Sequence, residues 1–388
     1  MNQLELNQIN NLPGMIDNWG DSAIQTYKVR NDLHEIFSQH GYELIETPIL
    51  EESELFIRKS GAELSTKLFS FIDQYGNKIC LRPEITPSII RHYIQNDQNK
   101  DLPWKIQYHG PIFRHDTKLR QSTQFGLEVI GGSGIEFESE LIYLSFEGMK
   151  KLGVKNTFIK LGNVGLIKEI LSNFNLSNTL KLFAINNISE LINSTISVTA
   201  LVNQAQQLGL LDDLNSTDTN HIKDPEVFLS KFSDENSQNY LGRRTAKEML
   251  QRLELKSERG NDKNNFISAL NLLVEIISIE TKDMKQLESI QKIINSANIP
   301  TNTINDTKLL IQNIYNHGIS ENSIQIDFSL ARGISYYTGI VFDIYQTVGA
   351  KPLVIGGGGR YDSLVKAFGG KDVPAIGFAY NLDSINNI

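Results

Sequence analysis

Strand-like segments gather at the two ends of this chain, and a long helical stretch separates them. Apolar residues alternate with polar ones near the N-terminus and again near the C-terminus, whereas the middle has helical spacing and is rich in Leu, Ile, Asn, Lys and Glu. Adjacent strands with helices beside them favour an α+β fold. We therefore expect a mixed, mostly antiparallel sheet flanked by helices. Its first part would cover residues 1–165, a helical insertion residues 166–320, and its second part residues 321–388.

The composition of the chain indicates a globular protein of a reducing compartment. The 388 residues are 40% hydrophobic and 21% charged, and the net charge of -8 gives no global attraction to nucleic acid. A local basic groove on an acidic protein stays compatible with that charge. Cys80 is the one cysteine, which excludes an internal disulfide and a cysteine-based zinc site. No secretory segment and no apolar run of membrane-spanning length is present, so we expect a cytoplasmic protein.

The segment STQFGLEVIG has the alternation of a strand with one polar and one apolar face. Gln124, Gly126 and Glu128 share one face, and the apolar residues between them share the other. A Gln and a Glu separated by a glycine have an open floor between them and are suited to hold a small polar ligand. An ordinary strand with one solvated face has the same pattern, so both interpretations stand.

The segment LARGISYYTGIVFDIYQ places an arginine in a run that is otherwise suited to a sheet interior. A buried guanidinium needs a partner. Read as a strand, the segment has Arg332, Tyr336 and Thr338 on one face and Tyr337 on the other. These residues form either a binding site or a tyrosine-rich strand whose arginine pairs with a structural carboxylate.

Two further charged residues stand near predicted element ends. Glu84 comes just before a helix that Thr86 is expected to cap, where a carboxylate either complements the helix dipole or binds a cationic group. Arg114 follows a predicted strand, where a guanidinium either holds a carboxylate or phosphate or forms a surface ion pair.

Neither a phosphate loop nor a metal motif is recognisable. The run Gly356–Gly359 lacks the Lys-Ser/Thr of a P-loop and the context of a Rossmann fingerprint, so it is better suited to a close approach of a flat ligand. The spacing of His92, His109 and His115 matches no zinc motif. No serine or cysteine nucleophile can be singled out, and we expect neither a metal nor a cofactor.

Four ordered motifs carry a family resemblance: RPEIT, GPIFRHDTKLRQSTQFGLEVIG, ARGISYYTGIVFDIY and GGGGRYDSLVKAFGGKDVPAIGFA. Together they resemble the catalytic-domain motifs of histidyl-tRNA synthetase and of its close paralogue, the ATP phosphoribosyltransferase regulatory subunit of histidine biosynthesis. The resemblance covers nearly all of the chain outside the helical middle. It implies a class II aminoacyl-tRNA synthetase-like fold.

The resemblance also implies a role in histidine binding for individual residues. Glu84 and Thr86 match the element that holds the ammonium group, and Arg114 matches the motif 2 arginine that contacts the ATP phosphate and carboxylate region. The other matches are Gln124 and Glu128 to the polar groups of the amino acid, Arg332 to the arginine that aids activation, Tyr336 and Tyr337 to the imidazole, and Gly357, Gly358 and Gly359 to the pocket floor.

Three departures separate the chain from an aminoacylating enzyme. Ser384 stands where motif 3 of the synthetases carries an arginine for ATP, the motif 2 loop after Arg114 is short, and no anticodon-binding domain follows motif 3. The retained Arg332 favours the opposite conclusion. The resemblance thus implies first a non-catalytic regulatory subunit, and as alternatives a truncated enzyme that activates histidine with ATP, or a binding module without an allosteric partner.

The implied partners follow from the regulatory reading. They are L-histidine and a short-form ATP phosphoribosyltransferase catalytic subunit, with this chain as a homodimer inside a hetero-oligomer and the region of Pro48 near the dimer interface. Neither tRNA nor a membrane is an expected partner.

Overall fold

The computed structural model describes residues 9–58, 67–96, 99–192, 195–211, 262–279, 284–330 and 336–385. The chain divides into two compact units. The first combines Met1–Leu166 with Glu280–Ile388, and the second is Ile167–Ile279. Both ends of the sequence therefore contribute to one unit, which holds all the strands named below.

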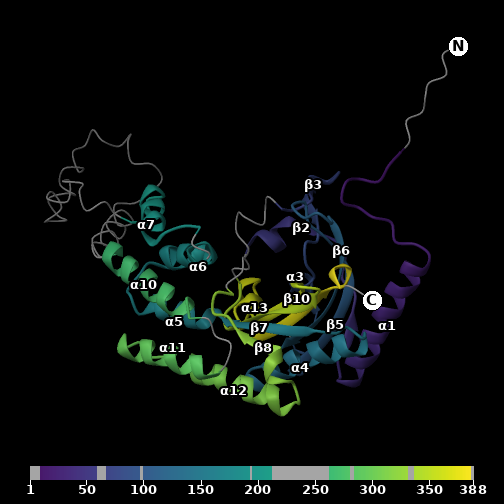
Figure 1. The fold of residues 1–388 in the computed structure, drawn as a ribbon. Coiled ribbons are helices and arrows are strands. Elements are labelled where there is room, and N and C mark those ends of the chain that lie inside the picture. The colour runs from purple at the N-terminus through teal and green to yellow at the C-terminus, as the bar shows by residue number, and fades with distance from the viewer. Residues whose placement is uncertain are drawn as a thin grey trace, which may run out of the picture. The chain divides into compact units, whose positions relative to one another are not determined.

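An eight-stranded mixed sheet forms the centre of the first unit (Figure 1). The six central strands pair antiparallel, and a short parallel strand lies at each edge. In spatial order the strands are β1 (Glu43–Ile45), β5 (Trp104–Phe113), β6 (Gln121–Ile130), β11 (Ala375–Asn381), β10 (Lys351–Arg360), β9 (Ile340–Val348), β7 (Thr157–Asn163) and β8 (Ile324–Ile326).

The pairing of β6 with β11 joins the two ends of the sequence. Figure 1 shows this as yellow C-terminal strands within a blue and teal sheet. In this register Glu128 lies opposite Gly377, and Gly126 lies opposite Ala379. On the other side of β6, Tyr108 of β5 lies opposite Gly126. The polar side chains of Glu128 and Tyr108 thus come together with small residues of the neighbouring strands in the middle of the sheet.

Helices cover both faces of this sheet. On one face α1 (Asp21–Gln39) and α4 (Ile135–Lys151) pack against β5, β6 and β11, as the contact of Phe37 with Phe125 and the hydrogen bond from Tyr380 to the Ser145 carbonyl indicate. On the other face α3 (Thr86–Asn96) and the short α13 (Leu364–Ala367) share a buried apolar cluster with β5.

Smaller elements complete the first unit. A three-stranded antiparallel sheet consists of β2 (Leu50–Glu52), β4 (Lys78–Leu81) and β3 (Ser70–Ile72). The helix α12 (Thr303–Asn316) packs on α4 and on α11 (Met284–Ser296). The 3₁₀ turns are η3 (Glu321–Ser323) and η4 (Leu382–Ser384), of which the second follows β11 directly.

The second unit is helical in its described part. Its helices α6 (Asn178–Ile192), α7 (Val198–Gln207) and α10 (Asp262–Ile277) pack on one another. The helix α5 (Val164–Ser172) begins in the first unit and continues into the second, because the division falls after Leu166. None of the helices in the described ranges is long and apolar enough to cross a membrane.

The expected fold class is confirmed: the sheet is mixed and mostly antiparallel, with helices on both sides. The helix α1 begins after Gly20, which stands at the N-cap position without a side-chain cap bond. Its apolar face is buried only from Val29 onward, whereas Ile24 and Tyr27 in the first two turns are 68% and 65% exposed. The packing of α1 against the sheet therefore rests on its second half.

Candidate functional site

A cavity of about 520 Å³ with both polar and apolar lining residues lies on the α3 side of the main sheet. This volume is in the range of small-molecule sites, roughly 300–1,000 Å³. Most of the residues singled out in the sequence line it, and they come from five separate stretches of chain. The lining includes Glu84, Thr86, Arg114, Gln124, Glu128, Tyr336, Tyr337, Gly357 and Gly358.

Glu128 lies at the buried end of the cavity and accepts three hydroxyl hydrogen bonds. Thr86 Oγ1 donates to its Oε1 at 2.5 Å, and Tyr108 OH donates to the same oxygen at 3.1 Å. Tyr361 OH donates to Oε2. The carboxyl group is only 1% exposed. Three donors fix its orientation, because each carboxylate oxygen has at least one partner.

Burial dominates the electrostatics of this group. Removal from water raises the pKa of Glu128 to about 7, although the three hydroxyl hydrogen bonds lower it. Burial also raises the pKa values of Tyr108 and Tyr361, and the nearby Glu128 raises them further. The phenols therefore stay protonated and remain donors. A cationic ligand group beside Glu128 would stabilise the ionised carboxylate.

A second carboxylate, Glu84, lines the same cavity next to Arg114. Tyr336 OH donates a hydrogen bond of 2.9 Å to Glu84 Oε2. Burial raises the pKa of Glu84, while the Arg114 guanidinium and the Tyr336 hydroxyl act against that rise. Arg114 is held by a hydrogen bond of 3.0 Å from its Nε to the Pro83 carbonyl. Anionic and cationic groups thus stand side by side at this end.

Gln124 adds an uncommitted acceptor to the lining. Its Oε1 is buried and accepts no hydrogen bond from the described residues, which makes it a candidate for a ligand N–H. Gln124 and Glu128 face the cavity, whereas Phe125 packs on Phe37 at the opposite face. The alternation expected for this strand is therefore observed.

The glycines make room mainly for protein groups. A Cβ on Gly377 would come within 1.5 Å of Glu128 Oε2, and one on Gly126 within 2.4 Å of the Tyr108 hydroxyl. Gly356, Gly357 and Gly358 line the cavity. Gly359 is not among the lining residues, and a Cβ there would lie 3.0 Å from Tyr337 Cε1.

The prediction that Tyr336 and Tyr337 point to opposite faces of a strand is wrong. The strand β9 begins only at Ile340, and both tyrosines precede it in a turn and an irregular segment. Both rings line the cavity, with their centroids 5.1 Å apart. Strand alternation does not apply to a segment outside a ladder. Arg332 lies outside the described residues.

The sequence interpretation missed Tyr108 and Tyr361, which hold Glu128. Tyr361 lies two residues after the last glycine of the run, and Tyr108 is opposite Gly126 in the neighbouring strand. A large side chain facing a glycine across a strand pair is a recognisable signal, but only once the pairing of β5 with β6 is known.

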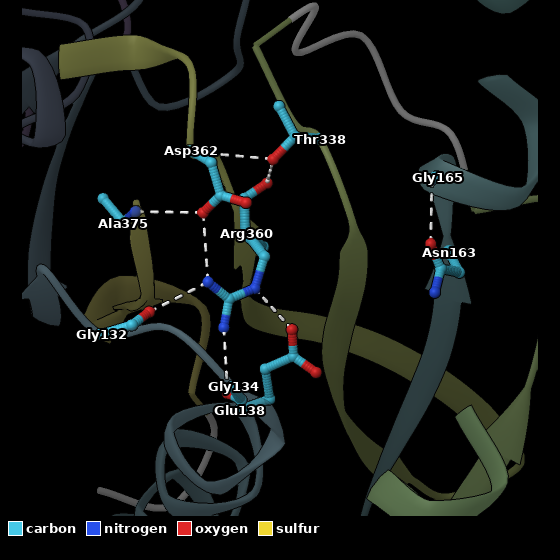
Figure 2. Close-up of polar contacts among 9 residues, drawn as sticks. All are labelled: Gly132, Gly134, Glu138, Asn163, Gly165, Thr338, Arg360, Asp362 and Ala375. Carbon is cyan, nitrogen blue, oxygen red and sulfur yellow. Dashed lines mark hydrogen bonds and ion pairs between the residues drawn. The ribbon is translucent and has the colours of Figure 1, made fainter. Parts of the chain in front are cut away.

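Beside the cavity, Arg360 has a complete set of partners (Figure 2). Its Nε lies 2.5 Å from Glu138 Oε1, and its Nη1 donates to the Gly132 carbonyl at 3.0 Å and to Asp362 Oδ1 at 3.1 Å. Its Nη2 donates to the Gly134 carbonyl at 3.2 Å. A buried guanidinium with this many acceptors is suited to a structural role. Arg360 is not among the cavity-lining residues.

The arrangement is suited to binding a small zwitterion that carries a second polar group. The described lining has four carboxylates, of Glu84, Asp116, Glu128 and Asp343, and two cationic groups, of Lys67 and Arg114. The phenols offer both a ring surface and hydroxyls. The described lining contains no serine, cysteine or histidine. The hydroxyl of Thr86 is present in the lining and donates to Glu128.

The fold and the cavity together define a domain of the class II aminoacyl-tRNA synthetase type. The family model of histidyl-tRNA synthetase matches residues 14–216 and 230–385. The chain belongs to the histidyl-tRNA synthetase family.

Curated relatives include histidine–tRNA ligases of archaea. The protein from Methanocaldococcus jannaschii is 28% identical over 361 residues, which cover 92% of this chain and 70% of the relative. The protein from Sulfurisphaera tokodaii is 28% identical over 375 residues, which cover 95% of this chain and 72% of the relative.

Two solved structures share the fold. An ATP phosphoribosyltransferase regulatory subunit/histidyl-tRNA synthetase from Bacillus halodurans has a TM-score of 0.70 and 19% identity, over 99% of this chain and 85% of its own. A histidine–tRNA ligase subunit from Alicyclobacillus acidocaldarius has a TM-score of 0.60 and 22% identity, over 98% and 97% of the two chains.

Proposed function

We propose that this protein is a non-catalytic regulatory subunit that binds histidine and thereby activates and feedback-regulates a short-form ATP phosphoribosyltransferase. One contrast carries the proposal. The cavity has charged groups that suit a whole amino acid, whereas the segment after β11 presents Ser384 where the synthetases are expected to carry an arginine for ATP.

The charges of the cavity support histidine as the ligand. Glu84 accepts the ammonium group, and the neighbouring Arg114 receives the carboxylate in a charge-assisted contact. Glu128 and Gln124 then lie within the same cavity as acceptors for the imidazole N–H groups, and the tyrosine rings cover its flat surface. Thr86 contributes by orienting Glu128.

The segment after β11 argues against tight nucleotide binding. Its one acidic side chain, Asp383, accepts a hydrogen bond from the Thr123 backbone N–H. The alcohol of Ser384 offers no positive charge to a triphosphate at the position of the expected arginine. Replacing an arginine in a phosphate clamp by an uncharged residue costs on the order of a few kcal/mol of binding.

The partner is proposed from the similarity in fold. A structure with a TM-score of 0.70 to this chain is an ATP phosphoribosyltransferase regulatory subunit/histidyl-tRNA synthetase. For regulation, histidine must bind two states of the complex with different affinity. We expect the chain to act as a homodimer within a hetero-oligomer.

The alternative is a truncated enzyme that activates histidine with ATP. The curated relatives favour it, because they are histidine–tRNA ligases. Arg332, which matches the arginine that aids activation, also favours it. Both functions require the residues proposed to bind histidine, and only the enzyme also requires ATP.

The deciding experiment mixes the purified protein with a short-form ATP phosphoribosyltransferase and measures product formation with and without histidine. We expect the protein to raise the activity and histidine to lower it again. Glu128→Gln should remove the response to histidine, whereas Glu54→Gln, at an exposed ion pair with Arg58, should retain it. An unchanged activity on addition of the protein overturns the regulatory function.

Histidine-dependent exchange between ATP and pyrophosphate tests the alternative directly. We expect no exchange above the rate without histidine. Robust exchange that Arg114→Ala abolishes would establish the enzyme and exclude a purely regulatory subunit.

A further inference from the structure

Tyr337 connects the cavity with the beginning of α5. Its ring lines the cavity, and it also packs against a buried cluster of Val164, Leu330 and Val341. Val164 is the first residue of α5, the helix that leads from the first unit into the second. A ligand that moves this ring therefore presses on the start of that helix.

Backbone contacts also join the residues after Tyr337 to the beginning of α5. The Val164 N–H donates a hydrogen bond of 2.9 Å to the Gly339 carbonyl. Gly165 approaches the same segment closely, because a Cβ on it would lie 3.4 Å from the Thr338 carbonyl oxygen and 3.7 Å from Gly339 Cα. Asn163 fixes the first turn of α5 by accepting a hydrogen bond of 2.9 Å from the Gly165 N–H (Figure 2).

Thr338, the residue that follows Tyr337, is held in place by hydrogen bonds to Arg360 and Asp362. The Thr338 N–H donates to the Arg360 carbonyl at 2.7 Å, and its hydroxyl donates to the same oxygen at 3.3 Å. The hydroxyl also accepts a hydrogen bond of 3.0 Å from the Asp362 N–H, as Figure 2 shows. Because Arg360 is itself fixed by Glu138 and two backbone carbonyls, this anchor is rigid.

We propose that Thr338 is a positioning residue through which filling of the cavity is transmitted to the first turn of α5. A ligand group that engages Glu84 meets the Tyr336 hydroxyl that bonds to it, and the adjacent Tyr337 ring must adjust. Because its hydrogen bonds hold Thr338 in place, Thr338 cannot move together with Tyr337. The movement of the Tyr337 ring is therefore directed toward Val164. The inference rests on the proposed function only in naming histidine as the ligand.

Hydrogen exchange of the α5 amides tests this transmission in the full-length protein. Histidine should slow exchange of the Val164 and Gly165 amides in the wild type by about tenfold, the scale of a typical coupling between sites. Thr338→Val keeps the branched shape but removes both hydroxyl contacts, so it should lose most of this protection. Thr338→Ser keeps the hydroxyl and should retain it.

Calorimetric titration with histidine on the same samples separates the possible failures. A wild type that binds no histidine overturns both the proposed ligand and the transmission. A wild type that binds histidine without any change in α5 exchange overturns the transmission alone and leaves the proposed function standing. The transmission is also overturned if histidine protects the α5 amides from exchange to the same extent in Thr338→Val and in Thr338→Ser.

Gly165→Ala examines the same contact from the helix side if Thr338→Val fails to fold. Its methyl group would lie 2.9 Å from Asn163 Oδ1, which must give way, and would be in ordinary contact, at 3.4 Å, with the Thr338 carbonyl oxygen. Alanine favours helix formation over glycine, so a general loss of helix stability is not expected. The histidine-dependent protection of α5 should fall, and full protection would contradict the proposal.

Discussion

Thr86 Oγ1 donates a hydrogen bond of 2.5 Å to Glu128 Oε1 and so connects the first residue of α3 to the middle of β6. Thr86 is thus both the first residue of α3 and a hydrogen-bond donor to the buried Glu128 carboxylate. Together with the two tyrosine hydroxyls it leaves Glu128 little freedom. We therefore expect ligand binding in the cavity to respond to the charge of Glu128, since its position is fixed in advance.

Glu128→Gln should weaken histidine binding at least about thirtyfold, or roughly 2 kcal/mol, because removal of one charged partner from a buried pair costs about that much. Isothermal titration calorimetry measures the change. The matched control is Glu54→Gln, whose carboxylate is exposed and remote from the cavity lining. An affinity that is unchanged in Glu128→Gln would remove Glu128 from the ligand site.

The stability of the ligand-free protein should depend on pH through Glu128. Its pKa is about 7 in the folded protein and near the ordinary 4.5 in the unfolded chain. Between these values the folded state binds more protons, so the free energy of unfolding falls as pH rises. The contribution is fully present below about pH 4.5 and is lost by about pH 7, for a total of about 3 kcal/mol.

Urea unfolding at several pH values, with wild type and Glu128→Gln in parallel, isolates this contribution. Glu84 has a raised pKa as well and is electrostatically coupled to Glu128, so the difference between the two proteins reports Glu128 together with this coupling. The wild type should lose stability relative to the variant across this window. Parallel curves for the two proteins would show that Glu128 does not titrate there.

Arg360→Met should lower the free energy of unfolding by about 3 kcal/mol or more, because it leaves Glu138 buried without its cation. Adding Glu138→Gln should recover part of this loss, and a double-mutant cycle from chemical unfolding quantifies the coupling. Arg58→Met removes an exposed ion pair and should change stability by less than about 0.5 kcal/mol. Strict additivity in the cycle would contradict direct pairing of Arg360 with Glu138.

Gly377→Ala should disturb the cavity by displacing Glu128. Its methyl group would meet Glu128 Oε2 at 1.5 Å, so the carboxylate must move away from its hydroxyl donors. We expect a loss of stability of about 2 kcal/mol, typical of overpacking, together with loss of histidine binding. In a Glu128→Ala background the same methyl group has more room and should cost less. An equal cost in both backgrounds would place the strain elsewhere, for instance at the Leu127 carbonyl.

Local rules were enough to find part of the site. Gln124, Gly126 and Glu128 share a face because strand alternation holds inside a paired strand, and β6 is paired on both sides. The sheet class followed from the same kind of pattern. In both cases the information lies within a few consecutive residues.

The remaining part of the site depends on contacts that are remote in sequence. Tyr361 reaches Glu128 only because β10 and β11 insert beside β6. Both tyrosines at 336 and 337 enter the cavity because the chain has not yet joined the sheet there, and alternation gave a wrong answer for them. A periodic pattern does not report where a ladder begins.

The pairing of β6 with β11 also determines when the protein becomes complete during synthesis. While the chain emerges from the ribosome, β6 can pair with β5 early, but its other edge stays open until residues 375–381 have been made. An unpaired strand edge is a template for aggregation. The nascent protein thus carries this exposed edge throughout translation of its second unit, and chaperone dependence should be concentrated in that interval.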